Sequence, residues 1–206
     1  MKKVIFSLIA ALILLLSFSI PLAAQRFELV PFAGYETGAK IEAISGGVFN
    51  ISGGLSYGGA FSIGFKNSYR LELSYNRMQS DLTYTIDNNP DPVCDLAVNQ
   101  ISIGFAYEYN PEDRFVPYGK FAIGSVIYEP TSTDTESEKI MHFTIAGGLK
   151  YNLSDHIGFR LQADLLLPLF FEGMYFTEGP SGEEPEVGTQ IAGVMGNFTA
   201  GLVFRF

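Results

Sequence analysis

The stretch LSYGGAFSIGF, from Leu55 to Phe65, alternates large apolar side chains with small ones at every second position. A period of two is that of a β-strand, in which successive side chains point to opposite faces. The small face carries Ser56, Gly58, Ala60, Ser62 and Gly64. A strand face in water usually carries Thr, Lys, Glu or Arg, because Gly and Ala are poor strand residues. The small row therefore predicts a crowded interior, and the large row predicts a face turned away from water.

The same alternation recurs along the rest of the chain. Seven further segments show it, at residues 27–35, 69–76, 100–109, 120–127, 143–151, 157–167 and 197–206. Their connections alternate between short turns, at 66–68, 110–113 and 153–156, and long ones, at about 36–53, 79–96, 129–140 and 172–190. Short turns at one end and long loops at the other are typical of a transmembrane barrel. We predict an all-β fold: an eight-stranded antiparallel transmembrane up-and-down β-barrel with short periplasmic turns and long, irregular extracellular loops.

A soluble barrel would need the same large apolar rows to point inward. Those rows are too bulky to fit together inside eight strands. Aromatic side chains on them also gather beside the turns and loops, with Tyr69, Tyr107 and Tyr151 at one end and Tyr35, Tyr57 and Tyr75 at the other. Two aromatic belts around an aliphatic middle are expected at the two interfaces of a membrane. The pattern favours lipid around the outside of the barrel.

The first residues have the order of a secretory signal peptide. Lys2 and Lys3 precede an apolar run from Val4 to Ile20, which Pro21-Leu22-Ala23-Ala24 follows. We expect cleavage after Ala24, so that residues 1–24 are removed and residues 25–206 form one barrel domain. An uncleaved membrane anchor is the alternative, and the run is at the short limit for it.

Charge and cysteine content narrow the possible partners. The full chain has 13 basic and 22 acidic residues, and without residues 1–24 the counts become 11 and 22, a net charge of −11. Such acidity argues against nucleic acid as a partner. Cys94 is the single cysteine, so no disulfide forms within the chain.

The small rows also carry charges of both signs. They include Glu28, Lys150 and Arg205, and six further residues for which we predict a charge network in the lumen: Arg70, Glu72, Glu108, Lys120, Arg160 and Asp164. Charges confined in this way pair, because an unpaired buried charge is costly. We expect a packed polar lumen with negligible conductance. A gated ion path is the alternative.

Catalysis in such a barrel would need a histidine and a serine placed to act on a lipid. His156 belongs to a predicted turn, and His142 begins a strand, with Ser137 near it in the sequence. Neither histidine stands in a recognisable motif, and spacing alone does not establish a nucleophile and a base. We expect no catalytic residue, no cofactor and no metal site.

The segments Pro31–Tyr35, Leu71–Tyr75 and Val116–Lys120 resemble those of small outer-membrane barrels of the OmpA membrane-domain and OmpX type, the generic outer-membrane β-barrel domain family. The final strand, with Thr199, Gly201, Phe204 and Phe206, resembles the C-terminal assembly signal of such barrels. The resemblance implies a monomer in the outer membrane, in contact with its lipid and lipopolysaccharide, and insertion by the barrel assembly machinery.

The predicted extracellular loops are acidic, with Asp87, Asp91 and Asp95 in one and Glu183, Glu184 and Glu186 in another. A solvated acidic rim and divalent cations bridging to lipopolysaccharide both fit this composition. Function in such a fold lies in the loops, so we expect a structural or surface-recognition role. The alternatives are a narrow ion or small-solute channel and a lipid A-modifying enzyme.

Overall fold

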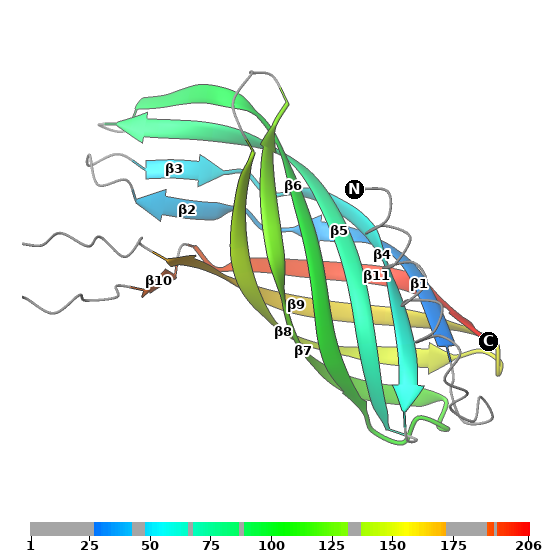
Figure 1. The fold of residues 1–206 in the computed structure, drawn as a ribbon. Helices are drawn as coiled ribbons and strands as arrows, with labels where there is room; N and C mark the ends of the chain where they lie inside the picture. The colour runs from blue at the N-terminus through cyan, green and yellow to red at the C-terminus, as the bar shows by residue number, and fades with distance from the viewer. Residues whose placement is uncertain are drawn as a thin grey trace, which may run out of the picture.

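The chain forms an antiparallel β-sheet that closes on itself as a cylinder, as a computed structural model shows (Figure 1). The structure describes residues 27–42, 48–65, 68–86, 89–131, 137–171, 189–191 and 193–206. The expected signal peptide, residues 1–24, and the acidic residues Asp87, Glu183, Glu184 and Glu186 lie outside the described residues.

Eight strands make the wall of the barrel. They are β1 (Phe27–Glu36), β4 (Gly54–Phe65), β5 (Tyr69–Ile86), β6 (Asn89–Glu108), β7 (Phe115–Pro130), β8 (Glu138–Asn152), β9 (Ile157–Phe171) and β11 (Met195–Arg205). Around the ring the order is β5-β4-β1-β11-β9-β8-β7-β6, and β6 pairs with β5 to close it. Every neighbouring pair is antiparallel. The predicted fold is confirmed.

Three shorter strands extend the sheet at the long-connection end. β2 (Ala39–Glu42) and β3 (Val48–Ile51) form a hairpin that pairs with β5, and β10 (Thr189–Ile191) pairs with β9. Figure 1 shows the β5–β6 hairpin projecting well beyond the ring at this end, with β2 and β3 beside it. The connections at 36–53 and 79–96 are long, as predicted, but the expectation that they are irregular is wrong for most of their described residues, which pair as strands. Thr83–Ile86 and Val48–Ile51 are mostly β-branched or aromatic residues, which favour a strand.

Burial alternates along the wall as the small and large rows require. Leu161 and Phe105, on large rows, are 58% and 62% exposed, whereas the charged Lys150, on a small row, is 3% exposed. The large apolar rows thus point outward and the charged rows point into the lumen, as predicted. In the described part of the chain, no helix has the length and apolar character needed to span a membrane.

Aromatic side chains gather at the short-turn end of the outer wall. The rings of Tyr69 and Tyr107 lie 5.2 Å apart, and those of Phe115 and Tyr151 lie 4.8 Å apart. The predicted turn at 110–113 also forms, since the amide of Asp113 donates to the carbonyl of Asn110 at 3.0 Å. Asn110 has a positive φ of 49°, a conformation that asparagine tolerates better than most residues.

Candidate functional site

The lumen at the short-turn end holds an alternating ring of four charges. Arg70 contacts Glu108 through Nε at 2.8 Å and Glu28 through Nη2 at 3.0 Å. Lys150 closes the ring, with its Nζ 2.5 Å from Oε2 of Glu28 and also donating to Oε1 of Glu108. Each acid therefore meets two cations and each cation meets two acids.

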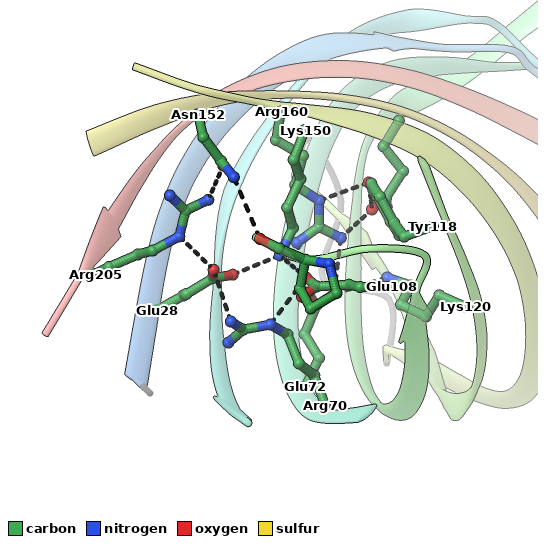
Figure 2. Close-up of polar contacts among 12 residues, drawn as sticks. Glu28, Arg70, Glu72, Glu108, Tyr118, Lys120, Lys150, Asn152, Arg160 and Arg205 are labelled. Carbon is green, nitrogen blue, oxygen red and sulfur yellow. Dashed lines mark hydrogen bonds and ion pairs between the residues drawn. The ribbon is translucent and has the colours of Figure 1, made fainter. Parts of the chain in front are cut away.

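Arg205, from the last strand, adds a third cation to Glu28. Its Nε donates to Oε1 of Glu28 at 2.8 Å, and its Nη2 donates to the side-chain carbonyl of Asn152 at 2.5 Å. Figure 2 shows Asn152, Arg205, Glu28 and Arg70 following one another across this end of the lumen. We call the set of Glu28, Arg70, Glu108, Lys150 and Arg205 the inner cluster.

A second group of charges lies further along the barrel. Glu72 accepts two hydrogen bonds from the guanidinium of Arg160, at 2.5 and 3.1 Å, and one from Lys120 at 3.0 Å. Lys120 also lies 3.8 Å from Oδ1 of Asp164. We call these four residues the middle cluster.

Tyr118 contacts one residue of each cluster, and Figure 2 shows it beside Arg160. Nε of Arg160, in the middle cluster, donates to its hydroxyl at 2.7 Å, and the guanidinium carbon lies 4.9 Å from the ring centroid. Lys150, in the inner cluster, is 5.7 Å from the same ring. A Cβ at Gly148 would come too close to the backbone carbonyl oxygen of Leu161 and would lie 2.5 Å from the Tyr118 hydroxyl oxygen, so glycine at this position makes room for the neighbouring strand and for the tyrosine.

The small rows explain how the lumen accommodates these long side chains. The two clusters draw on seven of the eight wall strands, and β4, with its Ser, Gly and Ala row, contributes no charge. Every member is buried or nearly so. Charges removed from water in this way are stable only when hydrogen bonds and opposite charges surround them, and both clusters provide these.

Beyond the middle cluster, the lumen contains amides and then apolar side chains. The carboxylate of Glu36 accepts hydrogen bonds from the amides of Asn76 at 2.8 Å and Gln100 at 2.5 Å. Next to the long connections lies a layer that we call the outer apolar layer: Ala39, Ile51, Met78, Leu96, Val98, Val126, Tyr128, Ile140, Leu166 and Met195. The prediction of a polar lumen is thus correct for the inner and middle parts and wrong for the outer part.

Little free space remains along this path. A cavity of about 40 Å³ lies between the middle cluster and the outer apolar layer, and it has room for roughly three water molecules. A wider vestibule of about 710 Å³ opens at the short-turn end, where the inner cluster and the turns at 111–114 and 153–156 line it.

The six residues of the predicted charge network fall into two groups. Arg70 and Glu108 belong to the inner cluster, while Glu72, Lys120, Arg160 and Asp164 form the middle cluster. That set omitted Glu28, Lys150 and Arg205, although all three lie on the small rows. It also omitted Glu36. This residue lies on the same face of β1 as Glu28, so the period-two pattern was sufficient to place it in the lumen.

The two histidines lie in different surroundings. His142 is 1% exposed, and its Nδ1 has no hydrogen-bond partner among the described residues. Its cross-strand neighbours are Gly124 and Pro168, while Ser137 is exposed. His156 is exposed in its turn. Within the described ranges, no three His, Cys, Asp or Glu side chains are arranged to hold a metal ion.

The residues of the proposed assembly signal lie on both faces of β11. Thr199 is buried and Gly201 faces Pro31 and Phe32 of β1, whereas Phe206 is 77% exposed. Phe204 pairs with Leu29 of β1 and Ile157 of β9. Their role in assembly stays a prediction.

A closed antiparallel barrel with an apolar outer wall, an aromatic belt and charges sealed inside defines a class of protein, the transmembrane β-barrel. The family model described as "Outer membrane protein beta-barrel domain" matches residues 10–206. The chain belongs to this outer membrane family, and its place is the outer membrane.

Solved structures share the fold. The chain is similar to the outer membrane protein OprG from Pseudomonas aeruginosa, with a TM-score of 0.63, 13% identity, and coverage of 88% of this chain and 95% of that one. It is also similar to Neisserial surface protein A, with a TM-score of 0.55, 15% identity, and coverage of 88% and 97%. No curated protein sequence matches the chain.

Proposed function

We propose that this protein is a non-conducting, non-catalytic barrel that serves as a rigid platform for recognition at the cell surface. The observation that carries the proposal is the filling of the lumen by the inner cluster, the middle cluster and the outer apolar layer in succession. A path for ions or solutes would require all three to separate. The interior therefore stabilises the barrel, and function falls to its ends.

The projecting hairpins supply the recognition surface. β5 and β6 stay paired from Tyr69↔Tyr107 to Ile86↔Asn89, and β3 adds a further strand to this extension. Pairing fixes the backbone of the extension, which reduces the entropy lost when a partner binds. The extension favours recognition over a purely structural role.

The surroundings of the barrel follow from its outer wall. Lipid contacts the large apolar rows, and lipopolysaccharide surrounds the end that carries β2, β3 and the β5–β6 hairpin. We infer export by the segment 1–24, insertion by the barrel assembly machinery through the last strand, and a monomer in the membrane.

A narrow channel is the second candidate, and the vestibule of about 710 Å³ is the observation in its favour. It brings water to the inner cluster from the short-turn end. A lipid-modifying enzyme has less support, because His142 is buried beside glycine and proline and Ser137 is exposed elsewhere.

Shortening the hairpin tests the platform directly. The variant replaces residues 83–93, which lie beyond the Leu82↔Cys94 pair, with a two-residue Asn-Gly turn, so that the ring and both clusters are untouched. Purified barrel in detergent is then used to capture envelope and host-surface material. The proposal expects the wild-type protein to retain a partner that the shortened variant loses, with the unfolding of the two barrels unchanged. Equal capture by both proteins, or capture by neither, would contradict a recognition role for this hairpin.

A further inference from the structure

The β1–β11 seam joins the two wall strands that are furthest apart in the sequence. Glu28 and Arg205, which face each other across it, are separated by 177 residues. Every other neighbouring pair in the ring consists of consecutive wall strands. Closing the ends of a long chain costs more entropy than closing a hairpin, so the seam is the most demanding contact in the barrel.

The backbone ladder of this seam has a gap. β1 pairs with β4 at every residue from Phe27 to Glu36, but with β11 it pairs at Glu28 and Leu29 and resumes only at Phe32. The register is the same on both sides of the gap. Pro31 lies in the gap and has no N–H to donate. The inner end of the seam is therefore a short segment, separated by the gap from the rest of its ladder and held by two backbone hydrogen bonds between Phe27 and Phe206, at 3.0 and 3.3 Å.

Glu28 lies in this short segment and is 1% exposed. Its two carboxylate oxygens contact Arg205 on β11 at 2.8 Å, Arg70 on β5 at 3.0 Å and Lys150 on β8 at 2.5 Å. Without Glu28 of β1, Arg70 and Lys150 would share the carboxylate of Glu108, and Arg205 would lose the carboxylate that it contacts. Docking of β1 against β11 therefore completes the charge pairing of the inner cluster.

We propose that the carboxylate of Glu28 holds the β1–β11 seam closed. Its carboxylate ties the last strand to the first, and ties both to β5 and β8, at the place where Pro31 interrupts the backbone ladder. Seam closure and completion of the inner cluster are then one cooperative step. This inference concerns how the barrel closes and goes beyond its role at the cell surface.

Hydrogen exchange of backbone amides in the complete barrel tests whether Glu28 holds the seam closed. The test variant is Glu28→Gln, which keeps the shape of the side chain and removes its charge. The control is Glu72→Gln, which removes an equally buried acid from the middle cluster, away from the seam. We expect E28Q to speed exchange at the inner ends of β1 and β11 by about tenfold or more relative to β6 and β7, the effect of losing one charge-assisted bond. E72Q should not single out the seam. Uniform acceleration in E28Q, no acceleration, or an equal seam effect in E72Q would overturn the proposal.

If E28Q does not fold, a disulfide across the seam tests whether Glu28 acts there. Leu29 and Phe204 are cross-strand partners on the outer face of the seam, at a spacing of about 4.5–5.5 Å between Cα atoms that a disulfide spans. The tethered protein carries Leu29→Cys and Phe204→Cys with Cys94→Ser. If Glu28 acts at the seam, oxidised E28Q with the tether recovers the folded form that migrates differently from boiled protein in a gel. Failure to fold with the seam tethered would show that Glu28 acts elsewhere.

Restoring the missing amide tests the link to Pro31. In the E28Q background, Pro31→Ala supplies a backbone donor at the gap. We expect exchange at Leu29 and Phe204 to slow again toward the wild-type rate. No slowing, in a variant that folds, would contradict the claim that the carboxylate compensates for the interrupted ladder.

Discussion

The two ends of the lumen are filled by opposite chemistries within the same wall of small residues. The inner and middle clusters hold acids and bases in alternation, and each contact depends on the position of a particular partner. The outer apolar layer needs only side chains of the right volume, such as Met78, Leu166 and Met195. This closed barrel is therefore sealed by directional contacts at one end and by packing at the other. Loss of one member should therefore cost more in the charged part than in the apolar part.

The largest effect is expected for Glu72→Ala. This change leaves Lys120 and Arg160 buried without their shared carboxylate, and breaking a buried pair by removing one partner costs about 3–5 kcal/mol. Urea unfolding of the barrel in lipid vesicles measures the loss. The control is Glu129→Ala, whose carboxylate on the outer wall is 46% exposed. A loss for E72A no greater than that for E129A would remove the basis of the comparison.

Leu166→Ala should cost somewhat less. It removes a 2% exposed side chain from the outer apolar layer, and a buried leucine replaced by alanine costs about 2–5 kcal/mol, depending on how far the site collapses. The same unfolding assay applies, at low and high salt. The loss should not change with salt, since no charge is altered. A marked salt dependence would show that the two parts of the lumen are coupled.

Gly148→Ala tests the contact between the inner and middle clusters. The added methyl would lie too close to the backbone carbonyl oxygen of Leu161 and to the Tyr118 hydroxyl, and overpacking of this kind costs about 1–3 kcal/mol. Tyr118→Phe combined with Gly148→Ala should lose less stability than the two single losses added together, because one of the two close contacts is absent. If the two losses simply add, the strain comes from the contact with the Leu161 backbone.

Arg77→Ala should have the smallest effect. Its guanidinium lies 3.9 Å from Glu129 on the outer wall, both side chains are partly exposed, and such pairs contribute about 0–1 kcal/mol. The unfolding free energy is again the measurement. A loss as large as that of E72A would mean that the outer wall, and not the lumen, holds the main ionic contacts.

The sequence predicts the strands of the barrel wall better than it predicts the contacts between side chains in the lumen. Period-two rows such as Leu55–Phe65 show directly which side chains share a face of a strand. The number of strands, the face that each strand turns to the lumen and the positions of the turns follow from these rows. Glu28 and Lys150 lie 122 residues apart on β1 and β8, and they meet only because the registers of β11 and β9 between them align the two side chains. Such partners cannot be derived without the register of every intervening strand.

The period-two pattern also did not predict the apolar filling of the outer lumen or the paired strands beyond the rim. Val98 and Val126 share the parity of the lumen, but parity does not distinguish an apolar filling from a polar one. The hairpin beyond the rim lies outside the period-two segments from which the strands were predicted, yet β3 pairs with Thr83 and Thr85 and extends the sheet there.

Single-channel recording in planar lipid bilayers tests the sealed lumen most directly. Purified wild-type barrel should insert without resolved conductance steps, because the inner cluster, the middle cluster and the outer apolar layer all remain in place. A matched variant with Met78→Gly and Met195→Gly thins only the outer layer and should also stay closed, since both clusters persist. Large, stable and reproducible conductance steps of the wild-type protein would contradict the claim that the lumen is sealed.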